Sequence, residues 1–137
     1  MPWLYPSLAG IPNFFLYGAI GVALTFIFAV IYIRITGHPE IKLIREGNAS
    51  AAIAFGGALI GFALPLSKAI AQASTVPDCV LWGALALVVQ LFAYGAARLI
   101  MPNLSQNISN NMMAAAVLAA SIAIVAGQLN AASMTYT

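Results

Sequence analysis

Four long apolar stretches alternate with short polar segments along the chain. The stretches cover residues about 13–35, 48–70, 79–101 and 111–133. Each matches the roughly 20 residues that a helix needs to cross the ~30 Å hydrocarbon core of a bilayer. They are continuously apolar and rich in alanine, whereas the strands of a membrane barrel would alternate over about ten positions. The pattern therefore predicts an all-α integral membrane protein with four transmembrane helices in one domain.

The composition supports this class. Of the 137 residues, 63% are hydrophobic and 6% are charged, whereas a soluble domain is roughly half apolar and about a quarter charged. The net charge of +2 is scattered along the chain, so it does not provide the clustered basic face of a nucleic-acid-binding protein. The partners we expect are the lipid bilayer and either a second copy of the chain or another membrane protein.

The distribution of basic residues predicts an orientation. Cytoplasmic loops of membrane proteins are enriched in lysine and arginine. The first and third connections are flanked by four basic residues, and only Lys68 lies toward the second. These four are Arg34, Lys42, Arg45 and Arg98. Both termini are therefore expected on the non-cytoplasmic side.

Two pairs of segments indicate an internal repeat. "LYGAI" (16–20) resembles "LWGAL" (81–85), and "NASAAIA" (48–54) resembles "NMMAAAV" (111–117). The pattern predicts two copies of a two-helix hairpin, with halves at about 13–74 and 79–134, related by an axis along the membrane normal. A shared bias toward small residues could also produce part of this match.

Small residues follow one face of the second apolar stretch. Because lipid gives no hydrophobic gain when helices associate, close packing through small residues drives their association. This face, with the neighbouring Gly56 and the glycine of the fourth stretch, is expected to contact either the other repeat or another subunit. Its members are Ser50, Ala54, Gly57, Gly61 and Pro65, and the glycine of the fourth stretch is Gly127. Pro65 predicts a packing kink or a gating hinge.

Three polar residues lie within the apolar stretches. Thr25 and Gln90 fall near mid-membrane, where a hydrogen bond between helices is their expected use. Lys68 lies about 20 residues into its helix, where its stem can reach the far interface. If all three faced one axis, they could instead line a polar path.

Polar residues also mark the start of the second and fourth stretches. Glu46 and Asn48 precede the second stretch, and Asn111 precedes the fourth. Carboxylates and amides at these places complement the helix dipole and accept hydrogen bonds from free N–H groups. We predict that these three residues cap the helices they precede.

The first connection holds most of the charge. Its acidic and basic residues alternate in sign, which predicts a solvated loop; they are Glu40, Lys42, Arg45 and Glu46. His38 has no second histidine or cysteine at ligand spacing, so no metal site is expected. The sequence also contains no HExxH, GxSxG, P-loop or dinucleotide-binding motif, and its three carboxylates do not share an intramembrane face. We therefore expect no enzyme activity, no catalytic residues and no cofactor.

A family resemblance follows from two blocks, "EGNASAAIAFGGALIGFALPLSKAI" and "NISNNMMAAAVLAASIAIVAGQLNAAS". Together they resemble the domain-of-unknown-function family 350, the YjfL-like bacterial inner-membrane proteins. The resemblance implies a small multi-pass protein of the bacterial plasma (inner) membrane, built from repeated two-helix units and without an assigned activity. It also implies an association, in some bacteria, with membrane-stress proteins of the phage-shock type.

Two functions remain open from the sequence. The first is a non-enzymatic structural or accessory subunit that packs through small-residue helix faces, in the setting of the membrane-stress response. The alternative is an oligomeric channel or small-solute transporter, with Thr25, Lys68 and Gln90 along its path.

Overall fold

The protein is all-helical over residues 4–134, the part of the chain that the computed structural model describes. The helices are α1 (Leu4–Ala9), α2 (Ile11–Thr36), α3 (Glu40–Arg45), α4 (Ala49–Gln72), α5 (Val76–Ile100), α6 (Leu104–Ser109) and α7 (Met113–Ser133). Of these, α2, α4, α5 and α7 are long and apolar enough to cross a membrane. A long apolar helix thus occupies each of the four predicted spans, with helix ends within a few residues of the expected positions.

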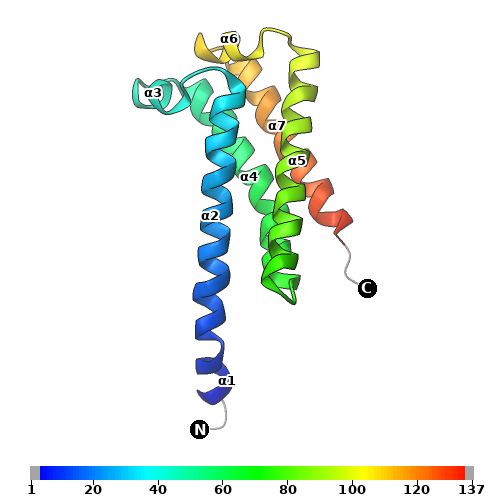
Figure 1. Cartoon of the computed structure of the whole chain (residues 1–137). Helices are drawn as coiled ribbons and strands as arrows, with labels where there is room; N and C mark the ends of the chain where they lie inside the picture. Colours follow the sequence, from blue (N-terminus) through cyan, green and yellow to red (C-terminus); the bar gives the residue numbers. More distant parts are fainter. Residues whose placement is uncertain (1–3, 135–137) are drawn as a thin grey trace.

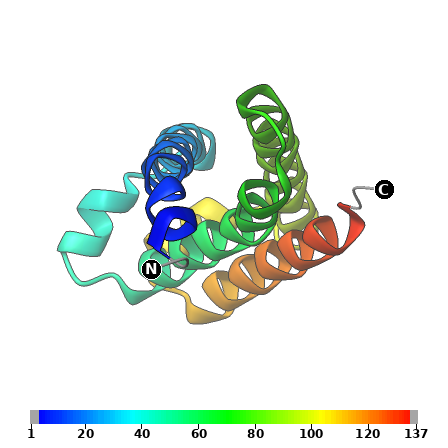
Figure 2. The same ribbon diagram turned by 90° about the horizontal axis from the view of Figure 1, so that it is seen from below.

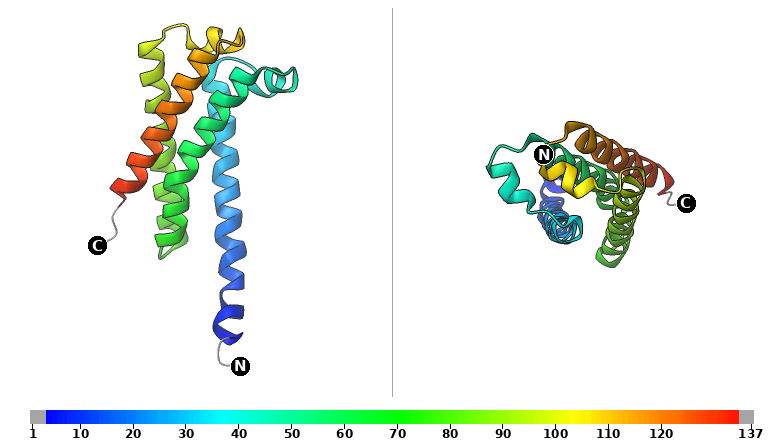
Figure 3. Two further views of the ribbon diagram at one scale, coloured as in Figure 1. Left: turned by 180° about the vertical axis from the view of Figure 1, so that it is seen from behind. Right: turned by 90° about the horizontal axis from the view of Figure 1, so that it is seen from above.

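The four long helices run alternately in opposite directions. α2 and α5 run toward the end of the molecule that carries α3 and α6, and α4 and α7 return from it (Figure 1). Both ends of the described chain consequently lie at the opposite end of the molecule. Seen along α2, the helices α4 and α7 lie side by side and are tilted in the same sense (Figure 2, Figure 3). α4 and α7 therefore form a parallel pair.

α4 lies at the centre of the packing. In the most apolar 18-residue stretch of α4, half of the residues are buried. In the corresponding stretch of the span that contains α2, only 11% are buried. Phe62 on α4 stacks on Phe28 of α2 with 4.5 Å between ring centroids. Tyr32 continues this cluster toward Tyr94 of α5, at 5.8 Å. α2 is thus held mainly through aromatic rings near its C-terminal end, and much of its remaining surface is available to lipid.

The first and third connections contain short helices where the sequence predicted breaks. α3 is followed by Gly47 at φ +88°, and α6 by Asn111 at φ +60°. Glycine and asparagine are the residues that adopt this left-handed conformation most readily at helix ends. In both junctions the next residue bonds back five positions: Asn48 N–H to the carbonyl of Leu43, and Met112 N–H to that of Asn107. The α3–α4 and α6–α7 junctions therefore share one backbone geometry.

Candidate functional site

The closest helix contact in the bundle joins α4 and α7. A Cβ atom built on Gly57 would overlap Ala120, and one on Gly127 would lie 2.7 Å from the Cα of Gly61. A Cβ on Gly61 would lie 2.8 Å from the carbonyl carbon of Ala123. Real Cβ atoms do not approach this closely, so each of these positions requires glycine. The predicted small-residue face is therefore placed against α7 of the same chain.

The other predicted packing residues of α4 differ in burial. Ser50, Ala54 and Pro65 are buried on α4. Gly56 differs, because a Cβ built on it would meet nothing within 4 Å. The structure thus separates Gly56 from Gly57, although the two are adjacent in sequence.

Pro65 has a specific effect on this contact. α4 continues through Pro65, but proline has no N–H, so the carbonyl of Gly61 loses its helical donor. That carbonyl faces the Cα of Gly127, where a Cα–H···O contact can form. The close approach of the two glycines therefore gives a contact to a carbonyl that the proline leaves free.

Gln90 lies beside the same crossing. Its amide Nε2 donates to the backbone carbonyl of Ala123 at 3.1 Å, and the side chain is buried. Its Oε1 has no hydrogen-bond partner among the described residues. Gln90 thus links α5 to α7, as expected for a polar residue that bonds between helices.

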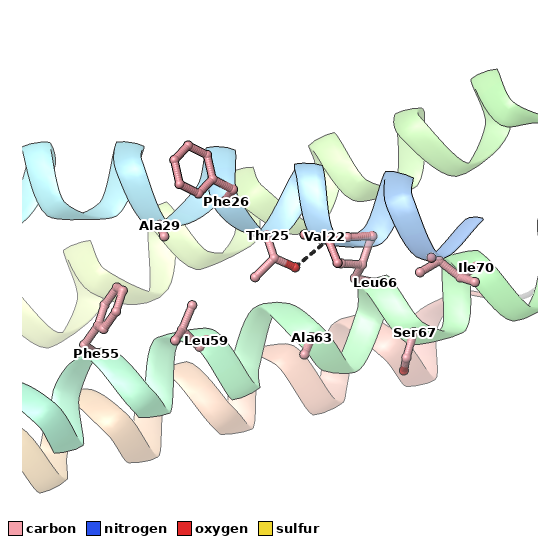
Figure 4. A pocket seen from close by; sticks show the side chains of 12 residues that line it. Val22, Thr25, Phe26, Ala29, Phe55, Leu59, Ala63, Leu66, Ser67 and Ile70 are labelled. Atoms are coloured by element: carbon pink, nitrogen blue, oxygen red, sulfur yellow. Dashed lines mark hydrogen bonds between the residues drawn. The ribbon is translucent and has the colours of Figure 1, made fainter. Parts of the chain in front are cut away.

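Thr25 lies in a different place, in an apolar groove between α2 and α4 (Figure 4). The groove has a volume of about 610 Å³. The Thr25 hydroxyl donates to the carbonyl of Gly21 on its own helix, at 2.8 Å, so it makes no bond between helices there. The groove is lined on α4 by Leu59 and Ala63, on the opposite helical face from Gly61.

The candidate polar path is therefore not brought together within one chain. Thr25 faces one side of α4, and Gln90 contacts the crossing on the other side. Lys68 is half-buried in the last part of α4. Position along the helices placed Thr25 and Gln90 at related depths, but the two residues lie on different sides of α4.

The predicted helix caps are only partly as expected. Asn48 caps α4, because its Oδ1 accepts from Ala51 N–H at 2.9 Å. The prediction for Asn111 was wrong: its Oδ1 accepts from Ser50 N–H on α4 at 3.1 Å, and α7 has no side-chain cap. The prediction for Glu46 was also wrong, since this residue closes α3 and its side chain is exposed.

Asn48 and Asn111 instead connect the two short-helix junctions. Asn48 Nδ2 donates to the carbonyls of Ile108 and Ser109 at the end of α6, at 3.1 Å each. Asn111 bonds in the other direction, to the first turn of α4. Each asparagine forms hydrogen bonds with backbone groups in the other half of the chain. The rule for helix caps considers only residues that are near in sequence, so it does not predict these bonds.

The largest buried polar site lies where α2, α3, α5 and α6 meet. We call it the polar cluster; it consists of Thr36, His38, Glu40, Tyr94 and Ser105. Ser105 donates to the carbonyl of Thr36, and its oxygen lies 2.9 Å from the Tyr94 hydroxyl and 3.2 Å from His38 Nδ1. The Thr36 hydroxyl bonds to Glu40 Oε1. The cluster thus closes the C-terminal end of α2 and ties it to α5 and α6.

The polar cluster contains an acid and a histidine that are both buried. His38 is 5% exposed and Glu40 is 1% exposed. His38 Nε2 lies 2.9 Å from Glu40 Oε1, although the two atoms are not aligned as a hydrogen bond, and Glu40 Oε2 has no hydrogen-bond partner among the described residues. The imidazole and the carboxylate thus lie against each other in the interior.

This arrangement corrects the prediction of a solvated loop. Glu40 and His38 are interior residues, whereas Lys42, Arg45 and Glu46 are exposed. One feature of the sequence indicates a tight turn at this place. His38 and Glu40 flank Pro39, and the residue before His38 is Gly37, which adopts the left-handed conformation. The burial itself depends on Tyr94 and Ser105, which lie far along the chain. No group of three or more His, Cys, Asp or Glu side chains within residues 4–134 is placed to hold a metal ion.

Comparison with known proteins gives a family. The family described as Domain of Unknown Function (DUF350) matches residues 6–134. The chain belongs to this family. It is 44% identical over 120 residues to the UPF0719 inner membrane protein YjfL of Escherichia coli strain K12, and equally to that of strain O157:H7. The match covers 88% of this chain and 91% of each relative. No solved structure matches the chain.

Membership fixes the setting of the site. As a DUF350 protein with four membrane-spanning candidates, the chain is a multi-pass protein of the bacterial inner membrane. The polar cluster then lies at one membrane interface, because it joins the ends of two spans to α3 and α6. The resemblance noted from the two sequence blocks is confirmed over nearly the whole chain.

Proposed function

We propose that this DUF350 protein is a non-enzymatic structural or accessory subunit of the inner membrane, in the setting of the membrane-stress response. The observation that carries the proposal is the rigid α4–α7 crossing, where Gly57, Gly61 and Gly127 admit no side chain. Such packing favours a fixed scaffold over a moving gate. α2 leaves most of its surface free of the rest of the described chain, and we propose that it contacts a second copy or another membrane protein.

The polar residues support this function more than a channel. Thr25 bonds within its own helix, and Gln90 bonds to the backbone of α7. Each therefore has a packing role, and the two occupy different sides of α4. A conducting path would require polar groups that line one continuous space.

We also propose that the chain is built from two repeated hairpins. Support comes from the α3–α4 and α6–α7 junctions, which share a left-handed residue and the same backbone hydrogen bonds. It comes further from the parallel course of α4 and α7 and of α2 and α5 (Figure 1). Each hairpin would then contribute one tilted helix to the central pair.

We propose that α3 and α6 face the cytoplasm. Arg34 and Arg98 lie in the last turns of α2 and α5, at the end of the molecule that carries α3. The positive-inside tendency favours this end as the cytoplasmic one. An alkaline phosphatase fused after Thr137 should therefore be active, and green fluorescent protein fused there should stay dark. The reverse pair of results would invert the orientation.

The mass and composition of the native complex test the function. The chain is extracted gently from its own membrane through a C-terminal tag and weighed intact. A stoichiometric foreign membrane protein, or a compact dimer, supports the subunit proposal. A closed ring of identical copies contradicts it and favours a channel, which is then tested as flux into liposomes. A lone monomer contradicts both functions.

A further inference from the structure

The end of the molecule that carries α3 has a strongly one-sided surface charge. Four basic side chains are exposed there: Arg34, Lys42, Arg45 and Arg98. Of the two acids in the same region, Glu46 is exposed, while Glu40 is buried against His38. The polar cluster therefore removes one of the two carboxylates that would balance the basic residues.

α3 presents part of this charge away from the bundle. The helix projects sideways from the ends of α2 and α4 (Figure 1, Figure 2). Leu43 and Ile44 are partly buried against the core, whereas Lys42 and Arg45 are exposed. Ile41 is also 45% exposed. Such a mixture of basic and apolar side chains is typical of a helix that lies in the membrane interface.

Two comparisons within the chain show that α3 is distinctive. α6 precedes a junction of the same geometry but carries no charged residue, and its Leu104 and Ile108 are fully buried. At the opposite end of the molecule, where α4 ends and α5 begins, Lys68 and Asp78 are both half-buried and of opposite sign. The excess of exposed positive charge is therefore confined to one membrane interface.

We propose that α3 and the adjoining end of α2 bind the headgroups of anionic phospholipids through Lys42, Arg45 and Arg34. The spans on either side fix α3 at the depth of the headgroups, so a lipid phosphate is within its reach without any other partner. Arginine offers paired donors to phosphate oxygens, and lysine offers a point charge. Ile41 contacts the acyl region beside them. This inference needs only the membrane setting, so it does not depend on the subunit function or on the orientation.

Lipid retention tests the proposal. The full chain is reconstituted in liposomes of equal parts phosphatidylcholine and phosphatidylglycerol, extracted in mild detergent, and analysed by native mass spectrometry for lipids that remain bound. Phosphatidylglycerol should be retained in preference to phosphatidylcholine, and less so as salt is raised. Lys42→Gln with Arg45→Gln should weaken its retention about thirtyfold, from about fivefold for each basic residue near a charged surface.

Two single substitutions provide controls. Lys68→Gln, at the other end of the molecule, should leave the retention of phosphatidylglycerol unchanged. Glu46→Gln removes the exposed acid beside Arg45 and should increase it. Equal retention of the two lipids by the parent chain, or an unchanged preference in the double variant with its thermal unfolding intact, overturns the proposal.

Discussion

Replacing Gly61 with alanine is expected to lower the free energy of unfolding by about 3 kcal/mol, the upper part of the range for overpacked positions. The new methyl group would lie 2.8 Å from the carbonyl carbon of Ala123 and 2.9 Å from Gln90 Nε2. The obstructing atoms of Ala123 belong to the backbone, so relief requires α4 and α7 to separate. Separation would also break the bond from Gln90 to Ala123 and the contact between Gly61 and Gly127. Unfolding by sodium dodecyl sulfate in mixed micelles, followed by circular dichroism, measures the loss.

Gly56→Ala is the matched control for this substitution. It adds the same methyl group to the same helix, but where nothing lies within 4 Å. Alanine favours a helix over glycine by roughly 0.5–1 kcal/mol, so Gly56→Ala should leave stability unchanged or raise it. The two substitutions therefore have opposite expected signs. Equal effects at the two positions would show that the close crossing is absent in the membrane-embedded protein.

His38→Gln is expected to destabilise the protein by about 1–3 kcal/mol, the usual cost of leaving a buried polar group without its partner. Glu40 would be left 1% exposed without the imidazole beside it, and one of its oxygens is already without a hydrogen bond among the described residues. The loss should be smaller when Glu40→Gln is added, because the double variant has no buried charge to compensate. Micelle unfolding of the two single variants and the double variant at neutral pH gives the coupling free energy.

Glu46→Gln serves as the comparison for the His38 series. Glu46 belongs to the same charged segment but is exposed, and such surface changes usually stay within about 0.5 kcal/mol. A His38→Gln variant as stable as Glu46→Gln would rule out the buried pair. Additive losses at His38 and Glu40 would show that the two side chains do not interact.

The long helices could be predicted because a membrane imposes a strong and simple constraint. An apolar run of about 20 residues has few alternatives to a spanning helix, since every backbone polar group must be bonded within the lipid. Gly57, Gly61 and Gly127 were also identified from spacing alone. Their partner was left open, because a small-residue face has the same pattern whether it meets its own chain or another one.

The junctions were harder to predict because their contacts are not local. α3 and α6 have six residues each, too short to show a helical period. Glu40 has the same alternating neighbours as a solvated charge, whereas the cluster in which it is buried includes Tyr94 and Ser105 from distant parts of the chain. Asn111 followed the rule for a cap but bonds to α4, because the other half of the chain brings Ser50 N–H within its reach. Thr25 and Gln90 were predicted at similar depths in the membrane. Depth alone does not determine which face of a helix a residue occupies, so their separation on two sides of α4 could not be predicted.

The even number of spanning helices has a practical consequence for work on the protein. Both ends of the described chain emerge on one side (Figure 1), so labels at the two termini are reached by the same impermeant reagent. The exposed side chains Lys42 and Arg45 of α3 lie at the other interface, where they can be modified separately. One reconstituted vesicle population can therefore be treated from each side in turn, with the termini and the α3 surface acting as independent reporters of insertion.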